Sequence, residues 1–309
     1  MMIDLAPQSR INNPALLGFI KAKSLTHEHL LAIVRTEAAR FPDHSTVRIL
    51  DVGCGRGDLL AYLSGNLSDL TSKKFEFYGF DVTDDGVHSD GYLLETIKNL
   101  SILRPDVTWS ERIRGISVNE SWPYPDDFFD VILSNQVLEH VMDYDHFFSQ
   151  LRRTLRDGGY CAQVFPLAHC IYESHVNLPF VHRMKNYEFL RGCIKAMSWL
   201  GLGNFKSQQR HSGISLDDFS KRTADYIMFF TNYLSHRDAL ELGKRYKMRA
   251  SYRYTKEFYE RKVRKILGLP ARSNYQMQGN ALYDWLCVMA FKYVSSVTLF
   301  CEKKVRGRF

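Results

Sequence analysis

The chain has 309 residues, 45% hydrophobic and 24% charged, a balance typical of a folded globular protein with a large buried core. This excludes a disordered tail, a collagen-like fibre and a mini-protein, and the lack of an internal repeat excludes solenoids and propellers. The formal net charge of +7 conceals an asymmetry: residues 1–160 carry 16 Lys and Arg against 23 Asp and Glu, whereas residues 161–309 carry 25 against 11. The basic half either faces something acidic, such as nucleic acid, an acidic glycan, a nucleotide-sugar or an anionic membrane surface, or merely solubilises the chain.

The first half of the chain alternates predicted strands and helices. Periodicity predicts, in order, a helix over 26–40, strands over 47–52 and 75–80, a helix over 92–100, strands over 113–118 and 130–134, a helix over 143–155 capped by Gly158 and Gly159, and a strand over 160–165. Strands alternating with helices predict an α/β fold, in which a parallel sheet is covered on both faces.

The second half loses this alternation. Residues 166–250 are interpreted as an insertion or lid, in which the Gly/Ser/Gln-rich stretch 201–215 is a predicted loop. A strand over 250–254, a helix over 255–267 and a strand over 294–301 follow. Residues 281–301 have the length of a bilayer span, but Asp284 and Lys292 interrupt them, so we predict a buried helix followed by a strand and no transmembrane span.

Two features indicate the compartment. The N-terminus has Asp4 early and no basic residue before an apolar run, which does not match a secretory signal. The six cysteines are scattered without a C-x-x-C pair, which indicates reduced thiols. We therefore predict a cytoplasmic protein. Peripheral binding to a membrane surface is compatible with this location.

The sharpest motif is VRILDVGCGRGD over residues 47–58, a strand that runs into Gly53, Gly55 and Gly57 and then into a helix. Glycines permit positive φ and close approach of a ligand to the backbone. A dinucleotide fingerprint would need a glycine at position 58, where Asp58 would repel a pyrophosphate, so the motif argues against NAD and FAD.

Carboxylates next to this loop favour a different ligand. Asp51 and Asp58 suit a cationic centre, and Asp81, at the tip of the next strand, can accept hydrogen bonds from both hydroxyls of a ribose. A cationic centre with a ribose and no pyrophosphate describes S-adenosylmethionine. The alternatives are that Asp81 is a helix cap or turn residue and that Asp58 is an N-cap.

Here the sequence resembles a known family. ILDVGCGRGDLLAYL looks like the cofactor loop of class I S-adenosylmethionine-dependent methyltransferases, and Asp81 looks like their ribose carboxylate. WPYPDDFFDVILSNQVLEHV (122–141) resembles the fourth-strand block of the small-molecule-type branch, as in methyltransferase type 11, and LRRTLRDGGYCAQVFP (151–166) resembles the helix and strand that follow.

The resemblance implies a Rossmann-like, doubly wound sheet of seven strands with helices on both faces, in which 294–302 is the antiparallel last strand. It divides the chain into an N-terminal helical segment (1–45), a cofactor-binding core (46–166), an α-rich insertion or substrate cap (167–250) and a completion of the core sheet (251–309). The cofactor site that these interpretations give together consists of Asp51, Gly53, Gly55, Gly57, Asp58, Asp81, Val82, Ser117, Val118 and Asn135.

One part of the family pattern is missing. The family usually places an acidic residue after the third strand to hold the adenine amino group, whereas this chain has GISVNE over residues 115–120. We expect Val118 to stack on the adenine and Ser117 or Asn119 to accept its hydrogen bond.

Three histidines are candidates for acid–base chemistry. His140 follows the fourth strand and could take a proton from an acceptor hydroxyl, or it could simply open the next helix. His169 and His175 lie on a loop with His182, where they could contact substrate, act as a base, or pack the loop. The spacing of these three fits no strong metal pattern, so no metal is expected.

The late segment 245–256 interleaves cations with aromatic rings, as single-stranded nucleic-acid surfaces do, but Tyr252 and Tyr254 also fit one face of a half-buried strand. Ser134-Asn-Gln-Val137 stands where methyltransferases of exocyclic base amines carry an Asn/Asp-Pro-Pro-aromatic motif, which argues against that reaction.

The function favoured by these observations is methyl transfer from S-adenosylmethionine to an oxygen of a small-molecule or saccharide acceptor, which could be anionic or lipid-linked. The alternatives are an RNA or protein methyltransferase that docks through the basic C-terminal half, and a catalytically silent protein that only binds the cofactor. Nucleic acid is the less favoured partner. The sequence does not indicate which oligomeric state the protein adopts.

Overall fold

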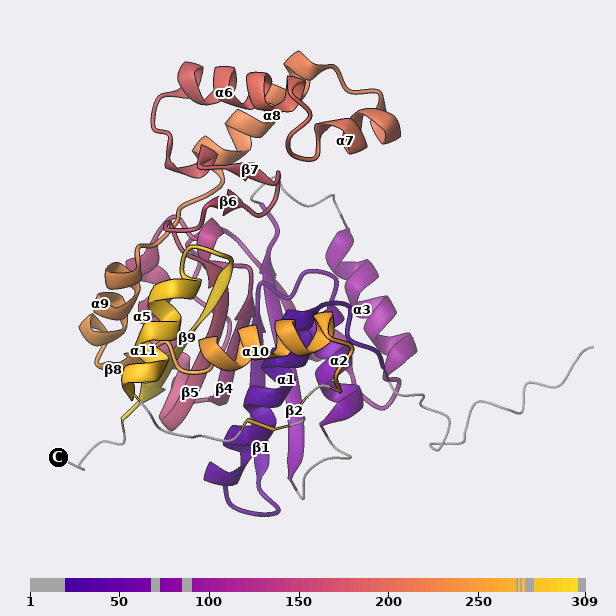
Figure 1. Ribbon diagram of the computed structural model, residues 1–309. Coiled ribbons are helices and arrows are strands. Elements are labelled where there is room, and N and C mark those ends of the chain that lie inside the picture. Colours follow the sequence, from indigo (N-terminus) through magenta and orange to yellow (C-terminus); the bar gives the residue numbers. More distant parts are fainter. Residues whose placement is uncertain are drawn as a thin grey trace, which may run out of the picture.

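A seven-stranded sheet forms the centre of the fold (Figure 1). The computed structural model describes residues 20–67, 73–84, 91–270, 272, 274–275 and 281–304. In spatial order its strands are β3 (Ile113–Ile116), β2 (Lys74–Val82), β1 (Thr46–Val52), β4 (Phe129–Asn135), β5 (Leu155–Pro166), β9 (Ser296–Lys303) and β8 (Met248–Ser251). Neighbouring strands from β3 to β5 are parallel, whereas β9 runs antiparallel to both β5 and β8. The predicted fold class is confirmed, including the antiparallel last strand.

Helices cover both faces of this sheet. Those of the core are α1 (Leu25–Glu37), α2 (Asp58–Asn66), α3 (Tyr92–Leu103), α4 (Trp109–Arg112), α5 (Tyr144–Thr154), α9 (His236–Arg245), α10 (Thr255–Ile266) and α11 (Ala281–Phe291), with short 3₁₀ turns η2 (Ala38–Arg40) and η3 (Leu138–His140). Three of these helices begin at a side-chain cap: Ser24, Asp143 and Ser235 accept hydrogen bonds from the first turns of α1, α5 and α9.

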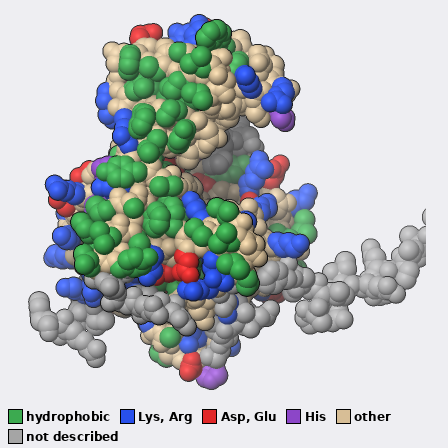
Figure 2. Space-filling model, in the orientation of Figure 1, with side chains coloured by type: hydrophobic (Ala, Val, Ile, Leu, Met, Phe, Trp, Pro, Cys, Tyr) green, Lys and Arg blue, Asp and Glu red, His purple; other side chains and the backbone are tan. Residues whose placement is uncertain are grey.

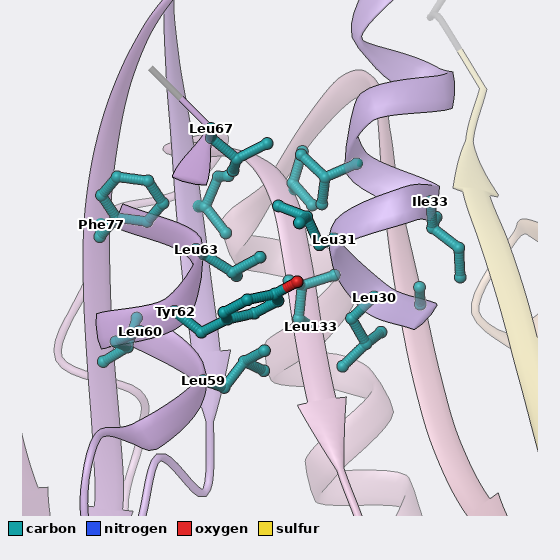
Figure 3. Close-up of a cluster of buried hydrophobic side chains, with 14 of the residues drawn as sticks. Leu30, Leu31, Ile33, Leu59, Leu60, Tyr62, Leu63, Leu67, Phe77 and Leu133 are labelled. Atoms are coloured by element: carbon teal, nitrogen blue, oxygen red, sulfur yellow. The ribbon is translucent and has the colours of Figure 1, made fainter. Parts of the chain in front are cut away.

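Alternation along the central strands divides the core into two layers. Val131 and Leu133 of β4 pack in the layer under α1 and α2, whereas Ile132 packs in the opposite layer with α5 and α9. Figure 3 shows the first layer, where Leu30 and Leu31 of α1 meet leucines of α2 above the sheet. The buried faces of helices and strands therefore have the periods that the sequence predicts.

The insertion stands above the carboxyl edge of the sheet (Figure 1). It consists of β6 (Tyr172–Glu173), β7 (Leu178–Pro179), η4 (Val181–Arg183), α6 (Tyr187–Trp199), α7 (Phe205–Ser212) and α8 (Leu216–Phe229). These elements share a hydrophobic cluster of their own, which includes Leu178, Leu190 and Phe219. Hydrophobic side chains also gather on the face of the insertion that Figure 2 shows. Phe189 and Trp199 of α6 are among the exposed hydrophobic residues of the insertion.

The insertion differs from its prediction in two ways. The predicted loop 201–215 was wrong, because Phe205–Ser212 form α7, in which Phe205 is buried against Phe219. The helix α9 lies within the predicted cap 167–250, yet its Ala239 and Leu242 pack in the core layer. We therefore propose that the insertion ends before α9.

Two further predictions are wrong in detail. Gly158 and Gly159 do not cap α5, which ends at Thr154; they lie inside β5, where Gly158 has φ +79° and the register with β4 shifts. Residues 281–301 do form a helix and a strand, but α11 is not buried: Leu282 and Trp285 are exposed, while Val288 packs inward. No helix among the described residues is long and apolar enough to cross a membrane.

Ion pairs join the acidic half of the chain to the basic half. Arg245 pairs with Asp145, Arg253 with Glu37, Arg261 with Glu28 and Lys303 with Asp127. Part of the basic excess in the second half is therefore used within the molecule. The N-terminal segment that indicated the absence of a secretory signal lies outside the described residues.

A buried histidine ties α1 to the C-terminal elements. His29 is fully buried; its Nδ1 lies 2.7 Å from the Tyr275 hydroxyl and its Nε2 lies 2.8 Å from Oγ1 of Thr298 in β9. Burial, reinforced by the positive charge of Arg261, holds the pKa of His29 well below 6.5. The folded protein therefore keeps this ring neutral.

We expect His29 to make stability dependent on pH. In the unfolded chain the ring binds a proton near pH 6.5, so its contribution is present above that pH and is lost as the pH falls below it, at up to about 1.4 kcal/mol per pH unit. Urea unfolding between about pH 5 and pH 7.5 measures this slope. His29→Gln should flatten it, whereas a matched change of the exposed His211 should leave it as steep as in the wild type.

Candidate functional site

The glycine loop after β1 is shaped by positive φ angles. Gly53, Gly55 and Gly57 have φ of +68°, +50° and +75°. A Cβ at position 53 would lie 2.6 Å from Cγ2 of Val137, whereas one at position 55 would meet no atom within 4 Å. The loop therefore packs against the β4 side at Gly53 and leaves open space at Gly55, where a ligand can approach the backbone.

Asp81 connects the tip of β2 to this loop. Its Oδ2 accepts a hydrogen bond from the Gly55 N–H at 2.6 Å, and its Oδ1 accepts one from the Val82 N–H at 2.9 Å. Asp51 is also buried, and burial together with the charge of Asp81 raises the pKa of Asp51 well above 3.8. Two carboxyl groups this close favour a positively charged ligand at the carboxyl edge.

The structure tests the alternative in which Asp58 is the N-cap of the helix after the glycine loop. It is the first residue of α2, and Gly57 is the N-cap, so the capping interpretation does not hold. Its carboxylate lies 2.6 Å from Nζ of Lys23 in the segment before α1. Its contact with a cationic ligand stays a prediction.

The loop after β3 presents a hydrophobic side chain. Val118 is about half exposed, and its N–H donates to Oδ1 of Asp84 at 2.8 Å, while the Ser117 N–H donates to Oε2 of Glu120 at 2.8 Å. The sequence analysis did not name Asp84, although it lies just beyond Asp81 and the end of β2. This geometry is compatible with Val118 as a stacking surface.

The remaining predicted cofactor residues lie at the ends of β2 and β4, the two strands that flank β1. Val82 is the last residue of β2 and is half-buried. Asn135 is the last residue of β4, and its Oδ1 is buried without a hydrogen-bond partner among the described residues. An acceptor atom of this kind, together with the open space at Gly55, fits a polar ligand at the edge.

A second polar cluster lies where the insertion meets the sheet. His140 and His175 have ring centroids 5.2 Å apart, and the Tyr226 ring of α8 lies 6.0 Å from the first and 5.4 Å from the second. His140 Nδ1 lies 2.8 Å from the carbonyl oxygen of Phe230, and His175 Nδ1 lies 2.6 Å from Oε1 of Glu173. The structure therefore brings together two of the three candidate histidines.

Two buried glutamates flank this pair. Glu139 is fully buried, neither of its carboxylate oxygens has a hydrogen-bond partner among the described residues, and burial raises its pKa to about 8. Glu173 accepts hydrogen bonds from the Tyr233 hydroxyl and from the N–H groups of His175 and Val176. Sequence reasoning named neither as a site residue.

The two partners in the Glu173–His175 pair shift each other. Burial alone would raise the pKa of Glu173, but the hydrogen bonds from His175 and Tyr233 leave it below 4.5. Burial alone would likewise lower the pKa of His175, but Glu173 raises it above 6.5. The pair is therefore an ion pair over more of the pH range than isolated side chains would be.

His169 and His182 lie outside this cluster. His169 Nε2 accepts a hydrogen bond from the His236 N–H at 3.3 Å, and its ring packs against Tyr293. His182 packs against Tyr233 and lines a cavity of about 280 Å³ at the base of the insertion. The three histidines of this loop therefore do not share one site.

The family follows from a sequence comparison. A family described as a methyltransferase domain matches residues 25–216, more than half of the chain. The chain belongs to this methyltransferase family. S-adenosyl-L-methionine is its co-substrate, and the two acidic strand tips, the glycine loop and the orphan Asn135 oxygen fit that ligand.

Similar proteins cover only parts of the methyltransferase. A fatty-acid O-methyltransferase of Mycolicibacterium smegmatis is 28% identical over 113 residues, which are 37% of this chain and 35% of the relative. An uncharacterized methyltransferase of Schizosaccharomyces pombe is 29% identical over 133 residues, 41% of this chain and 43% of the relative. The chain thus spans well under half the length of the curated relatives it matches.

Among solved structures, Haemonchus contortus phosphoethanolamine N-methyltransferase 2 in complex with S-adenosyl-L-methionine aligns with 90% of this chain and 52% of its own, with a TM-score of 0.46 and 14% identity.

We expect Asp81→Ala to weaken S-adenosylmethionine binding about ten- to hundredfold, because a charged acceptor to two hydroxyls contributes about 1.5–3 kcal/mol. Calorimetric titration of the full chain measures this loss. Asp81→Asn keeps an oxygen for the Gly55 N–H, so it separates loop support from ribose binding, and Asp217→Ala in α8 serves as the control. Unchanged affinity in the Asp81→Ala protein would contradict the ribose assignment.

Proposed function

We propose that this methyltransferase transfers the methyl group of S-adenosylmethionine to an oxygen of a small-molecule or saccharide acceptor held between the sheet edge and the insertion. The observation that carries the proposal is the cluster of His140, His175, Glu173 and Tyr226 at that junction. Oxygen acceptors lose a proton during methyl transfer, and this cluster offers imidazoles held in fixed orientation.

The division of roles follows from position. S-adenosylmethionine supplies an electrophilic methyl group when bound. Asp81 would hold the ribose, Asp51 would favour the cationic centre, and Val118 would pack on the adenine. His140, whose Nδ1 faces the Phe230 carbonyl, carries its lone pair on Nε2 in the neutral ring that donates from Nδ1, and can take the acceptor proton there.

Two further observations favour a small-molecule acceptor over a macromolecular one. The curated relative from Mycolicibacterium smegmatis is named for O-methylation of fatty acids, which are small and anionic. The rings of Tyr252 and Tyr254, which suggested stacking on nucleic-acid bases, are buried. Arg245 and Arg253 beside them are paired with Asp145 and Glu37. Tyr246 is the one partly exposed ring of the segment 245–256, and its hydroxyl donates to Asp145, so the segment lacks the row of exposed rings of a single-stranded nucleic-acid surface.

A transfer screen tests the proposal. The purified chain is incubated with tritiated-methyl S-adenosylmethionine and separate pools of fatty acids, lipid extracts, sugars, tRNA and protein. We expect label in a small-molecule or lipid pool, released by alkaline hydrolysis if the product is an ester and retained if it is an ether. Label only in tRNA or protein would contradict the proposal, and cofactor binding without transfer to any pool would favour the silent binding protein.

With an acceptor in hand, we expect His140→Gln to lower kcat by about 10²–10⁴ and to change the acidic limb of the pH profile, because general-base catalysis contributes about that factor. His175→Gln should lower kcat as well. His169→Gln is the matched control, since its ring faces His236 and Tyr293 instead. Steady-state kinetics decides: losses below threefold in both variants would mean that neither histidine handles the proton.

A further inference from the structure

Three side chains of metal-binding type converge at the base of the insertion. Glu139 and His140 lie in η3, directly after β4, and His175 lies in the turn between β6 and β7. One ligand atom from each lies within 4.8 Å of the other two. Two imidazoles and one carboxylate are a ligand set that divalent transition metals prefer.

The carboxylate of Glu139 is the unusual member. It is fully buried, and no described residue donates a hydrogen bond to either oxygen. A buried carboxylate in this state lacks the partners that normally compensate its removal from water. A cation bound beside it would supply that compensation.

Both histidines are oriented through the same ring nitrogen. His140 Nδ1 is hydrogen-bonded to the Phe230 carbonyl and His175 Nδ1 to the Glu173 carboxylate, so in each neutral ring the lone pair is on Nε2. Metal-bound histidines characteristically donate their other ring N–H to a carbonyl or a carboxylate. Glu173 is in turn fixed by Tyr233 and by two backbone N–H groups.

We propose that Glu139, His140 and His175 bind one divalent transition-metal ion, with its remaining positions open to water or to an acceptor oxygen. Ligands that share an ion at about 2.1 Å lie about 3–4 Å from one another, so small side-chain rotations bring the present set into range. His140 and His175 are both partly exposed.

This inference rests on the proposed function and deepens it. Methyl transfer from a sulfonium needs no metal, so the ion would act on the acceptor by holding and polarising its oxygen. The Nε2 lone pair of His140 would then bind the ion and would not take the acceptor proton, so the bound oxygen would lose its proton to solvent, while methyl transfer to an acceptor oxygen would stay as proposed.

Cobalt is the probe for the first test, because Co²⁺ bound to nitrogen and oxygen ligands absorbs visible light. The full chain is stripped with a chelator and titrated with Co²⁺, and Zn²⁺ is titrated in parallel by calorimetry. We expect one equivalent to bind. Glu139→Gln and His175→Gln should each weaken binding at least tenfold, whereas His169→Gln and the exposed His211→Gln should not.

Either of two outcomes would overturn the metal site. One is no binding up to about millimolar Co²⁺, and the other is equal Co²⁺ affinity in the wild type, Glu139→Gln and His175→Gln. Thermal unfolding of the stripped proteins shows whether Glu139→Gln still folds. If it does not, His175→Gln, which alters a partly exposed ring, decides alone.

A second measurement separates this inference from the proposed function. Transfer to the acceptor is followed with and without chelator, alongside cofactor binding. One equivalent of Co²⁺ bound without transfer to any pool would leave the metal site standing and contradict the function. An unchanged transfer rate in chelator, with no Co²⁺ bound, would support the function and overturn the metal site.

Discussion

Parallel strand pairing is the constraint on which both parts of the site depend. Because β2, β1, β4 and β5 run in the same direction, their carboxyl ends share one edge of the sheet, and so do the residues that follow them. Asp81 ends one strand beside the glycine loop, while Glu139 and His140 follow another. The insertion leaves the sheet after β5 at the same edge, which is why His175 can return to meet His140.

The sequence predicted the sheet well because its signals are local, and the prediction of the cofactor edge rests on signals of the same kind. An apolar run followed by closely spaced glycines and a carboxylate at the next strand tip can be recognised without any tertiary contact. The same is true of α10, where the 3.6-residue period matches the observed helix closely. The structure adds hydrogen bonds such as that from the Gly55 N–H to Asp81, but the residue types had already indicated the place.

The failures have a common cause, which is contact between distant segments. Gly158 was interpreted as a cap because glycines often end helices, yet β4 pairs with Leu155 before it and Tyr160 after it, so Gly158 lies at a register shift inside β5. Phe205 gives α7 its anchor through Phe219, which no local pattern reveals. His140 had a helix start as its alternative, and only the approach of His175 from the insertion shows its setting and that of Glu139. The asymmetry of charge was similarly misleading, since cations such as Arg261 pair with acids of the first half.

The cluster of Glu139, His140, His175 and Tyr226 lies across a seam between two packing units. Glu139 and His140 belong to the sheet, whereas His175 and Tyr226 belong to the insertion, which has its own hydrophobic cluster. The two segments that join these units hydrogen-bond to each other, and the Asn232 N–H also donates to the Glu139 carbonyl. A ligand that contacts both the sheet and the insertion would bind more tightly when the two are packed together than when they are apart. By thermodynamic linkage, such a ligand would increase the population of the packed arrangement. Binding of an acceptor at the proposed site and the population of the packed arrangement are therefore coupled.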